Sequence, residues 1–324
     1  MEDFQNQLFI NSPHTPSDFP STLPTDGLHD LDIILNGDAE KVLFSLPTHS
    51  VQCIVTSPPY YLQRQYGGQG EIGNEPSPAE YVQRLVAVFR ECQRILKPNG
   101  LLWLNLGDKY VNGCLLGMPW RVALALADAG WILRSDVIWH KPNAMPASIK
   151  NRPTPDHEYI FMFSLQSDYY YNADAIREPH VTFSEQSKMM GGRNHFGKRG
   201  GTPENGKNKG NSNLHDGRWD QAFHPLGRNK RTVWSIPLSK FPDAHFAVFP
   251  EKLVETCLLA STGPQDCVLD PFCGSGTTLL VAKKLGRHFI GIDCNQDYCL
   301  MARERLNGVQ AELLLETALR EQAI

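Results

Sequence analysis

The sequence predicts an α/β fold in which helices cover both faces of a mainly parallel sheet. Short apolar runs that favour strands alternate with helical patterns along most of the chain. The runs are apolar almost throughout, as in residues 101–106 (LLWLNL), which is typical of strands buried on both faces. With 324 residues, of which 41% are hydrophobic, the chain can bury one large domain with an insertion, or two modest domains.

A helix over residues 77–96 is the most strongly signalled element. Ser77 and Glu80 form a capping box around Pro78, which favours the first helical position. Apolar residues then recur at helical spacing as far as Leu96. Around this helix, the sequence predicts strands at residues 31–35, 51–55, 101–106, 137–140 and 159–163 and helices at residues 40–46 and 119–129.

A stretch rich in Gly, Asn, Lys and Arg, without apolar periodicity, interrupts the alternation at residues 180–235. After it, we expect helices at residues 249–260, 277–285 and 296–306 and strands at residues 267–270 and 288–293. The predicted organisation is one domain formed by residues 31–179 and 236–310, an inserted region at 180–235, an irregular arm at 1–30 and a tail at 311–324.

Composition excludes several classes of protein. No run of eighteen or more apolar residues exists, which argues against a membrane-spanning helix. Residues 1–18 lack the basic and apolar stretches of a secretory signal, so we expect a cytoplasmic protein. The eight cysteines form no CxxC pair, and we expect neither a disulfide framework nor a metal site.

Charge is distributed unevenly along the chain, whose formal net charge is −4. Residues 180–231 contain ten Lys or Arg and four Asp or Glu, a net +6, which leaves −10 for the remainder. A basic region in an acidic protein favours contact with a polyanion. A solvated loop with incidental charge is the alternative.

Residues 270–278 (DPFCGSGTT) connect a predicted strand to a predicted helix. Gly274 and Gly276 let the backbone approach a ligand, and the helix after them offers unpaired N–H groups. The turn lacks the third glycine of the dinucleotide fingerprint. The next strand, however, ends in Asp293, whose carboxylate can accept hydrogen bonds from ribose hydroxyls. Together these features favour a cofactor that contains adenosine.

Residues 56–60 (TSPPY) end a predicted strand in a stiff turn, because Pro58 and Pro59 restrict the backbone. Open α/β sheets bind ligands at the carboxyl ends of their strands. An aromatic amino group is a poor nucleophile, and it needs hydrogen-bond acceptors that direct its lone pair at the methyl group it receives. The Ser57 hydroxyl and the Pro58 carbonyl can be two such acceptors, and Tyr60 can stack on a flipped base. An ordinary proline turn is the alternative.

In this order, the motifs resemble the β class of DNA amino-methyltransferases, in which the catalytic tetrad precedes the cofactor motif. Residues 272–276 (FCGSG) match the family's FxGxG motif. Residues 57–60 (SPPY) match its tetrad in the form associated with N4 of cytosine, whereas adenine-N6 members more often begin with Asp or Asn. Further blocks in the family's order are residues 36–38 (NGD), 100–105 (GLLWLN), 139–143 (WHKPN) and 249–252 (FPEK).

The resemblance spans about residues 30–306, and only the inserted region lacks a template, where the family carries its target-recognition region. It implies a Rossmann-like methyltransferase fold with a circularly permuted order of motifs, S-adenosyl-L-methionine as cofactor, and direct attack by a flipped base. It implies double-stranded DNA as partner, at the nucleoid of a bacterial cell. It allows a restriction endonuclease for the same site, and it leaves monomer and homodimer open.

The resemblance also assigns residues. The implied catalytic residues are Ser57, Pro58, Pro59 and Tyr60. The implied cofactor-binding residues are Asp38 near the adenine, Phe249 near the methionine end, and Asp270, Phe272, Gly274, Ser275, Gly276, Thr277 and Asp293. The residues that we assign to DNA binding are Arg193, Lys198, Arg199, Lys207, Lys209, Arg218 and Arg228.

Several other functions fit the sequence less well. A C5-cytosine methyltransferase needs a cysteine nucleophile, but Cys92 lies on the apolar stripe of a helix. A serine nucleophile needs a neighbouring base, and Ser57 has no GxSxG context. His140 and His157 adjoin apolar strands and are interpreted as structural. Methylation of adenine N6, and a catalytically silent DNA-binding protein of the same fold, remain as alternatives.

Overall fold

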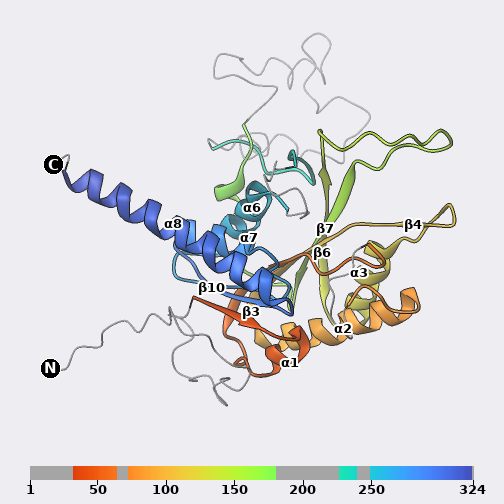
Figure 1. The fold of residues 1–324 in the computed structure, drawn as a ribbon, viewed down its shortest axis with the longest axis horizontal. Coiled ribbons are helices and arrows are strands. Elements are labelled where there is room, and N and C mark those ends of the chain that lie inside the picture. Colours follow the sequence, from red (N-terminus) through yellow and green to blue (C-terminus); the bar gives the residue numbers. More distant parts are fainter. Residues whose placement is uncertain (1–31, 64–71, 180–225, 239–248, 323–324) are drawn as a thin grey trace, which may run out of the picture.

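A computed structural model describes residues 32–63, 72–179, 226–238 and 249–322, and its largest element is an eight-stranded sheet (Figure 1). Across the sheet the strands follow the order β1-β10-β9-β2-β3-β7-β6-β8. Their bounds are β1 Ile33–Asn36, β2 Val51–Thr56, β3 Leu96–Leu106, β6 Ile132–His140, β7 His157–Ser164, β8 Val233–Ser235, β9 Cys267–Asp270 and β10 His288–Asp293.

The direction of the strands agrees with the predicted mainly parallel sheet. β1, β10, β9, β2 and β3 pair in parallel with one another. β7 alone among these eight strands runs the opposite way, because it is antiparallel to both of its neighbours, β3 and β6. β8 pairs in parallel with β6 and so restores the common direction at the edge of the sheet.

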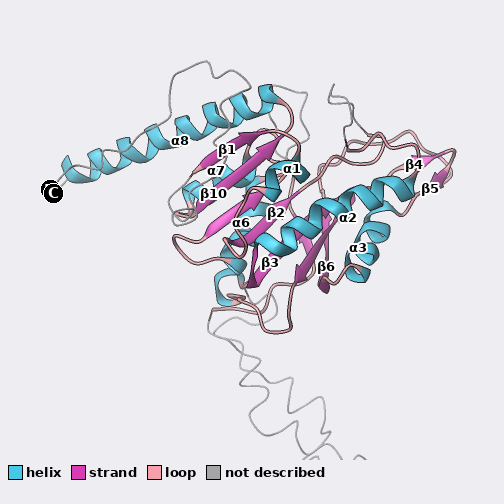
Figure 2. Ribbon diagram, turned by 90° about the horizontal axis from the view of Figure 1, so that it is seen from below, coloured by secondary structure: helices cyan, strands magenta, loops and turns pink. Residues whose placement is uncertain are grey.

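Helices cover both faces of the sheet (Figure 2). The helices on one face are α1 Ala39–Phe44, α2 Pro78–Ile95 and α3 Met118–Asp128, and those on the other are α6 Glu251–Ser261, α7 Thr277–Lys284 and α8 Gln296–Gln322. Neighbouring residues of β2 serve both layers, since Ile54 packs with the first group of helices and Val55 with the second. No described helix combines the length and the apolar character that crossing a bilayer requires.

The sequence signals of α2 act as predicted. The Ser77 hydroxyl accepts a hydrogen bond from the Glu80 backbone N–H and donates one to the Glu80 carboxylate. Tyr81, Leu85 and Phe89 are buried along the stripe that faces the sheet. The capping box and the apolar stripe therefore define this helix together.

Several elements differ from the prediction. A small hairpin of β4 Tyr110–Val111 and β5 Cys114–Leu115 follows β3, and a short 3-10 helix, η2, spans Asp174–Ile176. β8 lies inside the stretch assigned to the inserted region, yet it belongs to the sheet. The last helix continues past its expected end at residue 306 to Gln322. Residues 310–322 of this extension (QAELLLETALREQ) mostly have high helix propensity, which explains the difference.

β2 and β9 lie side by side at the point where the order of the sheet reverses. Cys53 pairs with Val268 and Ile54 with Leu269. From β2 the sheet continues to β3 on one side, and from β9 it continues to β10 on the other. The carboxyl ends of strands at such a switch point form a crevice that binds ligands in open α/β sheets. The residues that follow these two strands, at positions 57–60 and 271–276, are the two sequence motifs.

Candidate active site

The turn after β2 is held by packing and by one hydrogen bond from a helix. The Tyr81 hydroxyl of α2 donates to the Pro59 carbonyl, 2.9 Å away. Gly107, just after β3, leaves room for the ring of Tyr60, since a Cβ atom there would lie 2.6 Å from Tyr60 Cε2. Pro58 is buried, whereas Ser57 and Tyr60 are half-buried. Contacts with Tyr81 and Gly107 thus hold the turn in place, with Ser57 directly after the end of β2.

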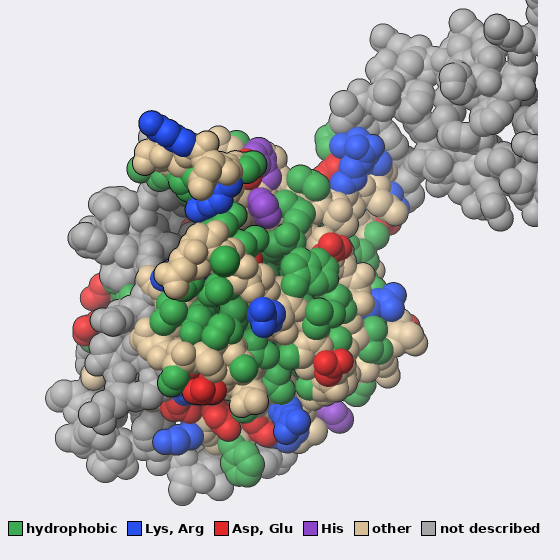
Figure 3. Space-filling model, turned by 90° about the vertical axis from the view of Figure 1, so that its right-hand side faces the viewer, with side chains coloured by type: hydrophobic (Ala, Val, Ile, Leu, Met, Phe, Trp, Pro, Cys, Tyr) green, Lys and Arg blue, Asp and Glu red, His purple; other side chains and the backbone are tan. Residues whose placement is uncertain are grey.

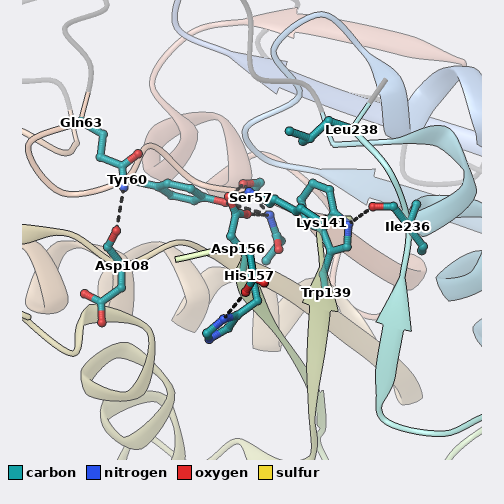
Figure 4. A network of polar contacts seen from close by, with 12 residues as sticks. Ser57, Tyr60, Gln63, Asp108, Trp139, Lys141, Asp156, His157, Ile236 and Leu238 are labelled. Atoms are coloured by element: carbon teal, nitrogen blue, oxygen red, sulfur yellow. Dashed lines mark hydrogen bonds and ion pairs between the residues drawn. The ribbon is translucent and has the colours of Figure 1, made fainter. Parts of the chain in front are cut away.

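A chain of hydrogen bonds runs from Ser57 into the protein (Figure 4). The Ser57 hydroxyl donates to the Tyr60 hydroxyl over 3.0 Å, and the Tyr60 hydroxyl donates to Glu158 Oε2 over 2.8 Å. The Asn105 amide nitrogen donates to both the Tyr60 oxygen, at 2.7 Å, and Glu158 Oε2, at 2.8 Å. Lys141 forms an ion pair with the other oxygen, Oε1, of Glu158.

The surroundings of these hydrogen bonds keep the Tyr60 hydroxyl protonated. Burial raises the pKa of Tyr60 well above its usual value, and the negative charge of Glu158 raises it further. Lys141 lies 4.5 Å from the centre of the Trp139 ring, and the Trp139 indole N–H is bound to the Ile236 carbonyl. Strand β6 therefore positions the cation that faces Glu158.

The loop after β9 takes the backbone conformation that its glycines permit. Gly274 and Gly276 both have positive φ, 50° and 77°. A Cβ atom at Gly276 would lie 2.7 Å from Ala302 Cβ, so glycine lets α7 and α8 approach. A Cβ atom at Gly274 would meet nothing within 4 Å, because that residue faces open space. The loop is therefore packed on one side and open on the side where a ligand can bind.

Asp293 organises this loop from the end of β10. Its two carboxylate oxygens accept hydrogen bonds from the backbone N–H groups of Gly274, at 2.9 Å, and Asn295, at 2.8 Å. Burial raises the pKa of its carboxyl above the usual value, and these two hydrogen bonds oppose that shift. Asp293 is half-buried, so it can face a ligand as well as hold the loop.

Arg305 of α8 holds the remainder of the loop, and the sequence did not point to it. One guanidinium nitrogen, Nη1, donates to the Ser275 carbonyl at 2.6 Å, the Ser275 hydroxyl at 3.0 Å and the Thr277 hydroxyl at 3.2 Å. Ser275 and Thr277 are both buried. Their hydroxyls therefore serve the internal structure of the loop.

Asp270 joins the two motifs. This carboxylate is buried, and it accepts hydrogen bonds of 2.7 Å from the hydroxyls of both Thr56 and Thr278. It also accepts one of 3.1 Å from the backbone N–H of Phe272. Burial raises the pKa of Asp270 to about 6, against the opposing effect of these three hydrogen bonds. Thr56 directly precedes Ser57, so one carboxylate ties the turn after β2 to the loop after β9.

Asp38 follows the end of β1, and Phe249 precedes α6. Asn36, at the end of β1, pairs with Asp293, and the Gly37 backbone N–H donates to the Asp293 carbonyl over 2.9 Å. Asp38 follows directly, is exposed, and caps α1 because its carboxylate accepts a hydrogen bond from the Lys41 backbone N–H. Phe249 is half-buried just before α6 and packs against the core on that face of the sheet.

Six of the seven residues assigned to DNA binding lie outside the described residues, and Arg228 is the exception. Its guanidinium forms an ion pair with Glu178 at 3.1 Å, and the backbones of the two residues form a bridge. Lys230 contacts the other oxygen of Glu178 at 3.4 Å. Arg228 thus helps to join the two ends of chain that flank residues 180–225.

His140, His157 and Cys92 each have a polar partner or a buried position in the structure. His140 contacts the Ser235 hydroxyl at 3.0 Å and Asp156 at 3.7 Å, and His157 contacts Asp156 at 3.5 Å. Cys92 is buried on α2, and burial raises its pKa. No cluster of His, Cys, Asp and Glu suited to a metal ion occurs within the described ranges.

One face of the molecule is seen in Figure 3, where hydrophobic side chains gather in the centre. Lys and Arg side chains are scattered over this face. Leu115 and Met145 are exposed hydrophobic residues of the described chain, at 55% and 82%. In the sequence, positive charge is concentrated in residues 180–231, of which residues 180–225 lie outside the described ranges.

Comparison with known proteins identifies the family. The sequence model of the N6/N4 DNA methylases matches residues 51–304, a range that contains both the turn after β2 and the loop after β9. This chain is a member of that DNA methylase family. Among curated relatives of the methylase, the Type II methyltransferase M.Cfr9I of Citrobacter freundii is 38% identical over 310 residues, covering 87% of this chain and 89% of that protein. M.SmaI of Serratia marcescens is 36% identical over 302 residues, covering 84% and 90%.

Solved structures share the fold of the methylase. The PvuII DNA methyltransferase (cytosine-N4-specific) superposes with a TM-score of 0.61 at 23% identity, covering 84% of this chain and 85% of that one. The putative DNA modification methylase TTHA0409 of Thermus thermophilus, complexed with S-adenosyl-L-methionine, gives 0.53 at 26% identity, covering 85% and 93%. The predicted Rossmann-like methyltransferase fold is confirmed.

Proposed function

We propose that this methylase transfers the methyl group of S-adenosyl-L-methionine to N4 of cytosine in double-stranded DNA. The observation that carries the proposal is the position of Ser57 and Tyr60. They follow β2, the strand that pairs with β9, and the Asp270 carboxylate accepts hydrogen bonds from Thr56 at the end of β2 and from Thr278 of α7. A base amino group and a methyl donor can meet only where two such sites adjoin.

The chemistry requires an amino nitrogen to attack although its lone pair is delocalised into the base. The Ser57 hydroxyl donates its proton inward to Tyr60, so its oxygen lone pairs are left for the amino N–H groups of a substrate. The Pro58 carbonyl is the second acceptor in this proposal. The flipped base stacks on Tyr60, whose ring Gly107 leaves room for.

S-adenosyl-L-methionine fits the second site by the chemistry of its donors and acceptors. The ribose hydroxyls are donors for Asp293, and the open side of Gly274 admits the methionine part. Asp38 approaches the adenine and Phe249 the methionine end. The complex of TTHA0409 with this cofactor, at 26% identity, supports the choice.

Cytosine N4 is favoured over adenine N6 because the tetrad begins with Ser57. Adenine N6 is the second candidate, since the family includes both activities. The deciding test is methyl transfer from labelled S-adenosyl-L-methionine to DNA, followed by digestion to nucleosides. We expect label in N4-methylcytosine. Label in N6-methyladenine would overturn the choice of base, and no label would leave a DNA-binding protein without activity.

The cofactor assignment predicts that Asp293→Asn weakens S-adenosyl-L-methionine binding by roughly tenfold or more. Asparagine lacks the negative charge that the ribose hydroxyls would bind, and its NH2 group would face one of the two backbone N–H groups that Asp293 now accepts from. Loss of one hydrogen bond to a charged group costs about 1.5–3 kcal/mol, which corresponds to at least about tenfold in affinity. Titration calorimetry measures the effect. Asp297→Asn, in the exposed first turn of α8, is the matched control and should bind as the wild type does. An unchanged dissociation constant for Asp293→Asn would remove this residue from the cofactor site.

A further inference from the structure

The hydrogen-bond chain behind Ser57 has a fixed direction. Glu158 forms an ion pair with Lys141 and, as a carboxylate, can only accept hydrogen bonds. The Tyr60 hydroxyl must therefore donate its one proton to Glu158 Oε2, at 2.8 Å. Its lone pairs then accept from Asn105, at 2.7 Å, and from Ser57, at 3.0 Å. Glu158 thereby determines which way each hydroxyl of the chain points.

Each hydroxyl and amide proton of Ser57, Tyr60 and Asn105 has an acceptor within this series of hydrogen bonds. Asn105 spends its two amide protons on Tyr60 and Glu158, its next contact being Ser57 at 3.5 Å. Tyr60 has one donated and two accepted hydrogen bonds, which is the full capacity of a phenol. The Ser57 hydroxyl, at the end of these hydrogen bonds, gives its one proton to Tyr60, so its oxygen lone pairs can accept hydrogen bonds from a substrate.

We propose that Glu158, acting through the Tyr60 hydroxyl, orients Ser57 as a hydrogen-bond acceptor for the target amino group and receives the proton which that group loses. The inference rests on the proposed function, because it needs an amino group as the acceptor of methyl. In this proposal Glu158, on β7, is a positioning residue, because it contacts Tyr60 at the end of the hydrogen-bond series that lies away from the substrate.

The step balances in atoms and charge. The amino nitrogen forms a bond to the methyl carbon as the bond from that carbon to sulfur breaks, and the sulfur keeps the electron pair. The nitrogen then gives one proton to Ser57 Oγ, while the proton of Ser57 passes to Tyr60 and that of Tyr60 to Glu158 Oε2. The positive charge of the sulfonium and the negative charge of the carboxylate both disappear. Lys141 stays paired with Oε1 and compensates the charge of Glu158 before the reaction.

Glu158→Gln and Tyr60→Phe test the chain at two links, because the first removes the accepting charge and the second removes only a hydroxyl. We expect each variant to lower the single-turnover rate of methyl transfer by about 100-fold or more, the range of general acid–base effects. Dissociation constants for S-adenosyl-L-methionine and DNA should stay within about threefold of the wild type, since neither group need touch them. The double variant should be no slower than the slower single variant, because one chain is broken twice.

Glu91→Gln, on α2 beside Arg94, is the matched control and should keep the wild-type rate. If an unpaired Lys141 unfolds Glu158→Gln, the Glu158→Gln/Lys141→Met pair removes both charges together. A Glu158→Gln rate within threefold of the wild type overturns the proposal. So do multiplicative losses in the double variant, or a rate loss matched by lost affinity. Failure of the proposed function is separate, because the wild type would then give no N4-methylcytosine.

Discussion

Alanine at Arg193, Lys198, Arg199, Lys207 and Lys209 together is expected to weaken DNA binding and to flatten its dependence on salt. These residues belong to the basic stretch that carries a net +6 in an otherwise acidic chain. If each neutralises one phosphate, their loss lowers the slope of log affinity against log salt by about 4.5, which is roughly 500-fold over a fourfold change in salt. Their Arg side chains, with the neighbouring Asn residues, can also read base edges.

The measurement is DNA affinity by fluorescence anisotropy across a salt series, with calorimetry for S-adenosyl-L-methionine. Cofactor affinity should not change. Arg90→Ala/Lys284→Ala, two exposed basic residues of α2 and α7, is the control and should keep the wild-type slope. A wild-type slope in the fivefold variant would mean that this stretch is a surface loop and that DNA recognition lies elsewhere.

Asp270→Asn is expected to change how stability depends on pH. Burial raises the pKa of this carboxyl from 3.8 to about 6 in the folded protein. Between about pH 4 and pH 6 the folded state therefore binds more protons than the unfolded state, and the free energy of unfolding falls as pH rises. A shift of about two pKa units corresponds to about 3 kcal/mol over this window. Asparagine does not titrate, so the variant should lack this decline.

Urea unfolding at intervals from pH 4.5 to pH 7.5 compares the two proteins, since the other titrating groups are common to both. The difference in stability between variant and wild type should shift in favour of the variant as pH rises, and it should level off above about pH 7. Asp297→Asn, which replaces an exposed carboxyl, should follow the wild-type profile. Parallel profiles for Asp270→Asn and the wild type would contradict the raised pKa.

The parts of the site that local sequence determines could be predicted. Two prolines and two glycines restrict or release the backbone in ways that do not depend on the rest of the fold. The alternation of strands and helices then places both motifs at the carboxyl ends of their strands. The pairing of β2 with β9, which places the turn at Ser57 and the loop at Gly274 after neighbouring strands, thus followed from motifs and topology together.

Glu158 could not be found in the same way. Glu158 lies at the start of an apolar strand. If that strand were parallel to β2, its start would lie at the edge of the sheet opposite the end of β2, and therefore far from Ser57. Only the reversed direction of β7 brings its first residues, His157 and Glu158, to the edge where β2 ends. An acidic residue at the start of an otherwise apolar strand was the available signal, and it gains meaning only once the direction is known.

Arg305 was missed for a related reason. In the sequence it is one of several charged residues in the last helix, where solvent exposure is the usual state. Its contacts with Ser275 and Thr277 depend on the close packing of α7 and α8 that Gly276 permits. Such a contact between distant segments leaves no periodic pattern in the sequence.

The order of the strands has a consequence for how the chain reaches its fold. The sheet combines five strands from before residue 180 with three from after residue 225, and the two groups pair at three places: β1 with β10, β2 with β9, and β6 with β8. A nascent chain that has emerged only as far as β7 therefore has open edges on both sides of its partial sheet. Contacts between residues so far apart in sequence form slowly, because a long loop must close first. We therefore expect the crevice between Ser57 and Gly274 to be among the last features to assemble during synthesis, and the exposed edge of β2 to depend on prompt completion of the chain.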